Sequence, residues 1–160
     1  MEKFSKITEG LNSGKQSIGL DLHGVIDCMP EFFSFLTNAI VKAGGDVHII
    51  TGGSIKKLVR GEDIPKFLKD NNIAYTHLFS IQDHHDEIGT PKSGAHPKYG
   101  FPMITDEQWD MTKAGYCESN NISLHIDDTL MYNEFFTTPF ARLWTHSNNP
   151  KVDKDHRHLA

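Results

Sequence analysis

Two apolar runs that lead into carboxylates constrain this chain most strongly. The first, residues 18–22, contains Asp21 and opens into a glycine-containing turn, and the second, residues 122–126, is followed by Asp127 and Asp128. Short apolar runs bounded by turn residues are typical of buried strands. Open α/β sheets bind their ligands at the carboxyl ends of the strands. We therefore expect the two strands to lie side by side and to hold a cation between their ends.

The rest of the chain alternates predicted strands with predicted helices. Pro30 begins one helix and Gly44-Gly45 ends it, and Thr105 with Gln108 forms a capping box at the start of another. The predicted strands are 17–22, 46–51, 74–80, 122–127 and 141–145. The predicted helices are 30–43, two short helices within 54–71, 105–119, and one or two turns within 129–136.

This alternation predicts the fold class. Strands and helices that alternate along a chain form a mostly parallel sheet covered by helices. We predict a three-layer, Rossmann-like α/β fold with about five parallel strands, in a single domain spanning residues 1–160. Its core covers about 17–146, and 147–160 is a polar tail. Residues 82–104 are rich in His, Asp, Gly and Pro without an apolar period, which predicts a lid-like loop over the site.

Composition and charge narrow the class of partner. The formal net charge of −5 disfavours nucleic acid and anionic membranes as partners. Cys28 and Cys117 lie in apolar contexts without metal-ligand spacing, which favours buried, reduced thiols and a reducing compartment. The first residues lack a signal-peptide core and no segment has the length of a membrane span. A cytoplasmic location is therefore expected.

The carboxylates predict a magnesium site. Three carboxylates that converge without a cation repel one another and raise one another's pKa. Oxygen-rich ligation without sulfur suits Mg²⁺, which needs only a couple of protein carboxylates. The alternative is that an Asp after a strand only caps a turn or a helix. For Asp21 alone the two interpretations are equally good, but Asp21 together with Asp127 and Asp128 favours the cation.

The ordered set of motifs resembles the haloacid dehalogenase superfamily of phosphatases. The set consists of Asp21-x-His23-Gly24-Val25, a strand ending in Thr51-Gly52, a lysine, and Ile126-Asp127-Asp128, over about residues 17–145. The resemblance implies a Rossmann-like sheet with its first and fourth strands adjacent, Mg²⁺, and an aspartyl-phosphate intermediate. The segment between Asp21 and Thr51 is too short for a large cap domain.

The resemblance also implies roles for the metal-binding residues. Asp21 matches the nucleophile, and a carboxylate can attack phosphorus if a cation offsets the repulsion between two anions. The backbone carbonyl of His23 and the side chain of Asp127 would complete the protein ligands of Mg²⁺. Asp128 would bind the ion through water or orient Asp127.

Phosphate binding falls to a second group of residues. The Thr51 hydroxyl would donate to a phosphoryl oxygen, helped by the backbone N–H groups of Gly52 and Gly53; Thr51 is equally suited to capping a helix. Lys113 lies on the apolar face of its predicted helix and would neutralise nucleophile and phosphate together. The alternative is that its side chain simply extends along this apolar face to reach solvent. The rival lysines are Lys92 and Lys98.

His23 is the departure from the family pattern. The phosphatases usually carry a second Asp two residues after the nucleophile as the general acid and base. Histidine can transfer protons near neutral pH, but a nearby cation would lower its pKa. We therefore predict a Mg²⁺-dependent phosphomonoester hydrolase. The alternative is a non-catalytic phosphate- or nucleotide-binding module on the same fold.

The remaining candidates concern the substrate and a second metal site. The resemblance implies that an open site often acts on a larger or polymeric substrate or uses a partner as cap. Because the acidic chain disfavours long nucleic acids, a nucleotide or a small phosphomonoester is expected. A base could stack on an aromatic ring, although core packing is the better interpretation of these rings: Tyr99, Phe101 and Trp109. The adjacent His84 and His85 predict a solvated lid more than a second metal site. His125 alternates with Asp127 and is interpreted as a hydrogen-bonded core histidine.

Overall fold

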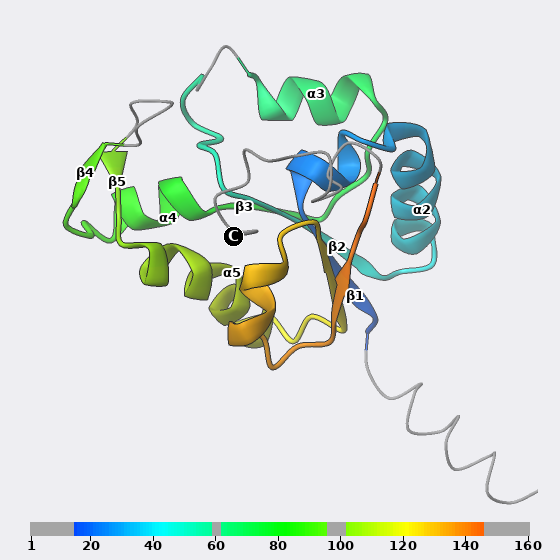
Figure 1. Cartoon of the computed structure of the whole chain (residues 1–160). Helices are drawn as coiled ribbons and strands as arrows, with labels where there is room; N and C mark the ends of the chain where they lie inside the picture. Colours follow the sequence, from blue (N-terminus) through cyan, green and yellow to red (C-terminus); the bar gives the residue numbers. More distant parts are fainter. Residues whose placement is uncertain (1–14, 59–61, 96–101, 146–160) are drawn as a thin grey trace, which may run out of the picture.

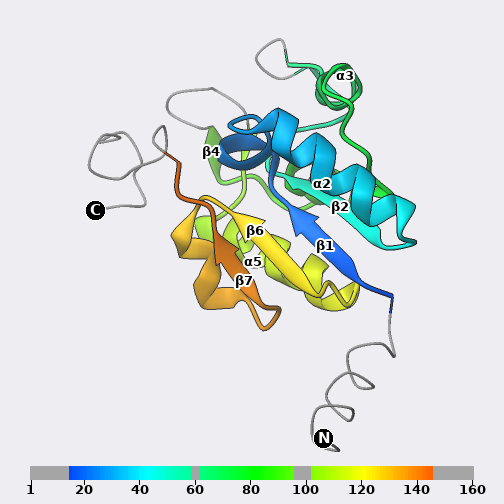
Figure 2. The same ribbon diagram turned by 90° about the vertical axis from the view of Figure 1, so that its right-hand side faces the viewer.

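The computed structural model describes residues 15–58, 62–95 and 102–145, which form an α/β fold around a five-stranded parallel sheet. The strand order is β3-β2-β1-β6-β7 (Figures 1 and 2). The strand that precedes Asp21, β1, is therefore adjacent to the strand that ends in Asp127, β6, as predicted. The strands are β1 (Ser17–Leu20), β2 (Asp46–Thr51), β3 (His77–Ser80), β6 (Leu124–Asp127) and β7 (Phe140–Arg142).

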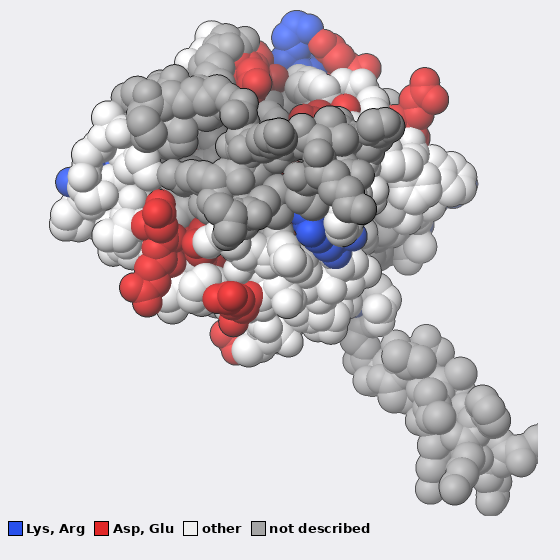
Figure 3. Space-filling model, in the orientation of Figure 1, with Lys and Arg blue, Asp and Glu red and all other residues white. Residues whose placement is uncertain are grey.

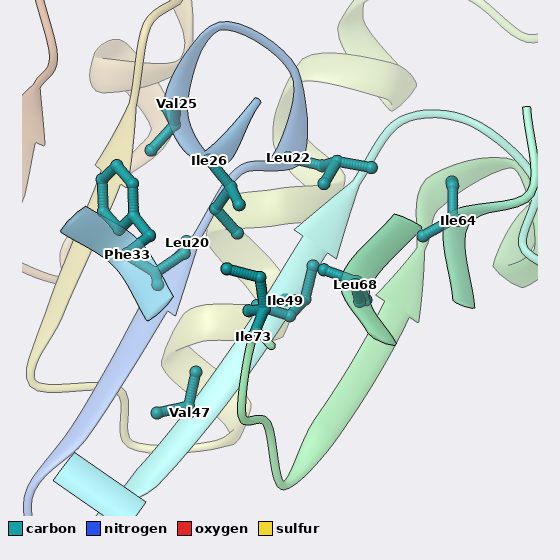
Figure 4. Close-up of a cluster of buried hydrophobic side chains, with 10 residues drawn as sticks. All are labelled: Leu20, Leu22, Val25, Ile26, Phe33, Val47, Ile49, Ile64, Leu68 and Ile73. Atoms are coloured by element: carbon teal, nitrogen blue, oxygen red, sulfur yellow. The ribbon is translucent and has the colours of Figure 1, made fainter. Parts of the chain in front are cut away.

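Helices cover both faces of this sheet. On one face Ile49 packs in a cluster with Phe33 of α2 (Pro30–Lys42) and Leu68 of α3 (Ile64–Asp70) (Figure 4). On the other face Ile50 packs with Cys117 of α5 (Asp106–Ser119). Because successive side chains of a strand point to opposite faces, the neighbouring isoleucines of β2 each hold one helical layer. The three-layer prediction is therefore confirmed.

The strand register brings the two acidic strand ends to one edge. Leu20 of β1 pairs with Ile49 of β2 and with Ile126 of β6. The next residue of β1, Asp21, donates its backbone N–H to the Ile126 carbonyl at 3.0 Å. Since Asp127 follows Ile126 directly, parallel pairing places both carboxylates at the carboxyl edge of adjacent strands.

The predicted helix starts are also found. Pro30 is the first residue of α2. Thr105 caps α5 by accepting from the Gln108 backbone N–H, and the Gln108 side chain accepts in return from the Thr105 N–H. The prediction for 129–136 corresponds to a 3₁₀ helix, η2 (Leu130–Phe135).

The prediction of two short helices within 54–71 was wrong. The described part contains one helix there, α3, and residues 54–57 form a turn. The carboxylate of Asp83 holds this turn by accepting from the Ser54 hydroxyl and from the backbone N–H groups of Ile55 and Lys56. A tertiary contact therefore determines the backbone of this segment, which local periodicity cannot reveal.

The prediction of a lid-like loop over 82–104 was also wrong in its first part. Helix α4 (Ile81–Glu87) begins there, because the Ser80 hydroxyl accepts from the Asp83 backbone N–H as an N-cap. Two short antiparallel strands follow, β4 (Gly94–Ala95) and β5 (Pro102–Met103). The loop prediction for 96–101 and the predicted tail at 147–160 lie outside the described residues.

The two cysteines differ in burial. Cys117 is buried, but Cys28 is only half-buried, so the expectation of two buried thiols was wrong for Cys28. Both are free thiols.

Within residues 15–58, 62–95 and 102–145, no helix combines the length and the apolar character needed to cross a membrane.

His48 makes the stability of the fold depend on pH. Its ring is buried on β2, stacks on His77 with centroids 4.2 Å apart, and lies 2.9 Å through Nδ1 from the Tyr116 hydroxyl. Burial, and secondarily the neighbouring His77, lower the pKa of His48 from 6.5 to about 4, against the opposing charge of Asp46. Between about pH 4 and pH 6.5, His48 is therefore protonated in the unfolded chain but neutral in the folded protein.

We predict that the free energy of unfolding falls by about 1–3 kcal/mol from this one histidine as the pH drops from 6.5 to 4. Urea unfolding across this range should show a shallower fall for His48→Asn, which keeps an acceptor for Tyr116 without the titrating ring. Equal losses in the parent and the variant would contradict the assignment, since the other titrating groups are common to both.

Candidate functional site

Three carboxylates converge at the carboxyl edge of the sheet. One oxygen from each of Asp21, Asp127 and Asp128 lies within 4.8 Å of the others, and the three residues are 6%, 0% and 8% exposed. Asp21 follows β1, Asp127 ends β6, and Asp128 is the next residue. The predicted convergence is therefore found, and it involves buried rather than solvent-exposed acids.

Lys113 of α5 completes this cluster from the helical layer. It is 1% exposed, and its Nζ lies 2.6 Å from Asp127 Oδ2 and 3.1 Å from Asp21 Oδ1. The ammonium also lies 4.7 Å from the centroid of the Tyr132 ring. Lys92 forms an ion pair with Asp86 at 2.8 Å instead. Lys98 lies outside the described residues. Of the two candidate lysines that the structure describes, Lys113 is the one at the carboxylate cluster.

The charges of the cluster do not balance. Burial raises the pKa of Asp21, and the nearby Asp127 and Asp128 add to the effect while Lys113 opposes it. Burial alone would also raise the pKa of Asp127, but Lys113 and the His125 hydrogen bond outweigh it and lower this pKa. Burial likewise opposes the charge of Lys113, whose pKa is nevertheless raised by Asp127 and Asp21. The Lys113 ammonium thus pairs with two of the three carboxylates, Asp21 and Asp127. A divalent cation there would favour the ionised form of Asp21.

The turn after β1 depends on Gly24. Its φ of +79° suits glycine, and a Cβ there would lie 2.3 Å from Asp128 Oδ2. The backbone N–H of Gly24 donates to Asp27 Oδ1 at 2.7 Å. The turn therefore needs a residue without a side chain where it meets Asp128.

The His23 side chain pairs with two carboxylates outside the cluster. Its Nδ1 lies 3.4 Å from Asp27 Oδ2 and its Nε2 lies 3.3 Å from Glu62 Oε2. The Asp27 hydrogen bond raises the pKa of His23 despite partial burial, and the charges of Asp21 and Glu62 add to it. The expected lowering of this pKa by a cation is thus opposed by these carboxylates. The ring nevertheless remains half-exposed at the rim of the site.

The residues predicted to bind phosphate lie at the end of β2. Thr51 is fully buried, and its hydroxyl has no hydrogen-bond partner in the described part of the chain. A buried polar atom without a partner is rare in proteins and points to a ligand or a functional constraint. A Cβ on Gly52 would lie 2.7 Å from Trp109, whereas Gly53 has open space around its Cα. The Thr51 hydroxyl is therefore an unsatisfied buried donor at the carboxyl end of β2.

Trp109 has a structural role. It packs against Gly52 and donates from Nε1 to the Tyr132 hydroxyl at 3.0 Å. The preferred interpretation of this ring as a core residue agrees with these contacts. The other two rings considered for base stacking, Tyr99 and Phe101, lie outside the described residues, as does His96.

His84 and His85 do not form a metal site with each other. His85 is buried, with Nδ1 2.8 Å from the Thr90 hydroxyl and Nε2 2.7 Å from the Thr112 hydroxyl. His84 faces the ring of Phe79. The expectation of a solvated lid was therefore wrong for His85, because helix α4 turns this side chain toward α5.

The interpretation of His125 as a hydrogen-bonded core histidine is confirmed, because the buried ring donates from Nε2 to Asp127 Oδ2 at 3.1 Å. The sequence interpretation missed a second contributor to the site, Tyr132. Tyr132 covers Lys113 from η2. No sequence pattern identifies that contact, because it depends on how η2 packs on α5.

This arrangement combines an oxygen-ligand cluster, a buried cation and an unpaired hydroxyl. Carboxylate oxygens without sulfur suit Mg²⁺. A buried ammonium and a hydroxyl donor suit an anion that approaches the same edge. The arrangement therefore places groups that suit a divalent cation beside groups that suit an anion.

We predict that Lys113→Met lowers the free energy of unfolding by about 3–5 kcal/mol at pH 7, because it leaves buried carboxylates without their cation. The matched control is Lys92→Met, which removes a partly exposed ion pair and should cost less than about 1 kcal/mol. Urea unfolding of both variants measures the difference. Similar small losses in the two would contradict the buried ion-pair geometry.

The chain matches no protein-family model, no curated protein and no solved structure.

Proposed function

We propose that the protein is a Mg²⁺-dependent phosphomonoester hydrolase of the haloacid dehalogenase type, acting through an aspartyl-phosphate on Asp21. The observation that carries the proposal is the convergence of Asp21, Asp127 and Asp128 with Lys113 at the carboxyl edge of the sheet. The unpartnered hydroxyl of Thr51 at the same edge supports it.

The donor set fits Mg²⁺. Asp21, Asp127 and the backbone carbonyl of His23 would hold the ion directly, and Asp128 would hold it through water or support Asp127. Mg²⁺ in proteins keeps several waters and binds through one or two carboxylates and the phosphate of the substrate. When bound, it would offset the repulsion between the Asp21 carboxylate and the anionic substrate.

The residues of the chain then have defined roles in two displacements. An oxygen of Asp21 attacks phosphorus, the bond from phosphorus to the ester oxygen breaks, and His23 gives its proton to that leaving oxygen. Water then attacks the phosphorus of the aspartyl-phosphate, gives a proton to His23, and releases phosphate and the Asp21 carboxylate. Lys113 and the Thr51 hydroxyl hold the phosphoryl oxygens in both steps.

The orientation of Asp21 suits the first step. Its Oδ1 accepts from the Leu22 backbone N–H at 2.8 Å and lies 3.1 Å from Lys113 Nζ. Among the described residues, no donor is bonded to Oδ2. One oxygen thus anchors the side chain, and the other is available to attack phosphorus.

The orientation of His23 favours the alternative, a phosphate- or nucleotide-binding module without turnover. Its two ring nitrogens face Asp27 and Glu62, so the ring must turn to reach a leaving oxygen. Exposed side chains change rotamer on the ps–ns timescale, so this rotation is no obstacle for a half-exposed histidine. We therefore keep the hydrolase as the leading proposal.

The substrate proposed is a small phosphate ester or a nucleotide. On the face shown in Figure 3, the basic and acidic side chains of the described residues are scattered, and the basic ones form no continuous patch. The net charge of −5 supports a compact phosphorylated substrate over a long nucleic acid. Cytoplasmic location remains part of the proposal.

We predict Mg²⁺-dependent release of phosphate from at least one member of a panel of phosphomonoesters, with activity lost in EDTA. Asp21→Asn should lower kcat by about 10³-fold or more, because an amide is a poor nucleophile. Asp86→Asn, at a surface carboxylate paired with Lys57 and Lys92, should keep the parent activity. Tight phosphate binding without any turnover would favour the binding module, and a fully active Asp21→Asn would exclude the covalent mechanism.

We predict that His23→Ala slows hydrolysis of alkyl phosphates by about 10²–10⁴-fold, because a poor leaving group needs a general acid. Hydrolysis of p-nitrophenyl phosphate should fall much less, since its leaving group departs without protonation. The Mg²⁺ concentration for half-maximal activity should stay near the parent value, because the proposed ligand is the backbone carbonyl of His23. Equal losses on both substrate types would rule out the general-acid role.

A further inference from the structure

His125 is a fully buried histidine in the central part of the sheet, two residues before a proposed metal ligand. Its Nε2 lies 3.1 Å from Asp127 Oδ2. Because a carboxylate oxygen can only accept, Nε2 carries the hydrogen of this bond. We infer that His125 is a positioning residue that directs a divalent cation to the other oxygen of Asp127, an inference that rests on the proposed metal site.

The bonds to Asp127 determine where a cation can bind. A carboxylate has roughly four lone-pair positions, two on each oxygen. Oδ2 receives Lys113 Nζ at 2.6 Å and His125 Nε2 at 3.1 Å, so both of its positions are used. Oδ1 receives the Thr129 backbone N–H at 2.9 Å. Among the described residues, these are the donors to Asp127, and one position on Oδ1 remains for a cation.

Without His125, Oδ2 would keep one open position beside Lys113. A cation bound there would lie next to the ammonium, where the two positive charges repel. The imidazole therefore both fixes the rotation of the carboxylate and blocks the unfavourable oxygen. Groups that hydrogen-bond to a metal ligand in this way commonly control its affinity for the metal.

The backbone of β1 is adapted to this ring. Gly19 pairs with His125 in the sheet register, and a Cβ on Gly19 would lie 2.7 Å from His125 Nδ1. Glycine weakens the interior of a strand and often marks a close approach. The ring of Phe136 stacks on the other side of the imidazole, with centroids 5.0 Å apart and planes 8° apart. The histidine is therefore held in one position.

Packing alone does not explain a histidine here. Its buried Nδ1 has no partner of good hydrogen-bond geometry in the described part of the chain, and its polar neighbour is the backbone of Gly19. The hydrogen bond of the ring with another side chain is the one to Asp127. The residue type is therefore explained by what it does to Asp127 rather than by filling the core.

A matched set of variants in the full-length chain tests this role. His125→Gln keeps an N–H donor at a similar distance from the backbone, and His125→Met has a similar length without a donor. His125→Phe keeps a ring that can stack on Phe136 and also lacks the donor. Mn²⁺ serves as the probe because its free form is measured directly by electron paramagnetic resonance, and urea unfolding without metal identifies the folded variants.

We expect His125→Met and His125→Phe to weaken Mn²⁺ binding by about 10-fold or more. His125→Gln should remain within about threefold of the parent. Should the Met variant fail to fold, the Phe variant carries the comparison with Gln. Parent-like Mn²⁺ affinity in a folded variant without the donor, or equal losses for Gln and for Met or Phe, would overturn the inference.

The same titration separates this inference from the proposed function. A parent chain that binds no Mn²⁺ would remove the metal site itself, and the role of His125 with it. If the parent binds Mn²⁺ and all three variants bind it equally tightly, only the role of His125 is excluded, and the hydrolase proposal remains.

Discussion

The buried ammonium of Lys113 is the interaction on which the site depends. A lysine that is 1% exposed needs carboxylates within hydrogen-bonding distance, and Asp127 and Asp21 supply them. These two acids come from strands that are far apart in sequence but adjacent in the sheet. One helix, α5, and two strands must therefore be in place before any of the three charges can be buried. The fold and the proposed chemistry share this requirement.

Close approaches of backbone to side chain hold the surrounding elements at the distances the site needs. Gly24 lets the turn after β1 meet Asp128, and Gly52 lets the end of β2 lie against Trp109. Trp109 in turn donates to Tyr132, whose ring covers the Lys113 ammonium. Glycine at these two contacts therefore lets the proposed phosphate-binding end of β2 and the carboxylate cluster lie at the same edge of the sheet.

Much of the fold was predictable from the sequence because its signals are local. Apolar runs gave the strands, and the Thr105 capping box and Pro30 gave two helix starts. The convergence of Asp21 with Asp127 followed from the rule that parallel strand ends share an edge. The turn held by Asp83, the helix α4 and the direction of the His23 ring were not predictable, because contacts between distant segments determine them. Lys113 could be favoured over its rivals by its place on an apolar helix face and by the resemblance, which implies a lysine before the last acidic pair.

The most direct test of the central claim is an anomalous-scattering map from crystals soaked in Mn²⁺. The account predicts one ion bonded to carboxylate oxygens of Asp21 and Asp127, at the roughly 2.0–2.2 Å typical of small divalent cations with oxygen ligands. The Asp127 oxygen in that bond should be the one that accepts from Thr129. The absence of an ion at this edge at saturating Mn²⁺, or an ion bound only elsewhere on the protein, would contradict the account.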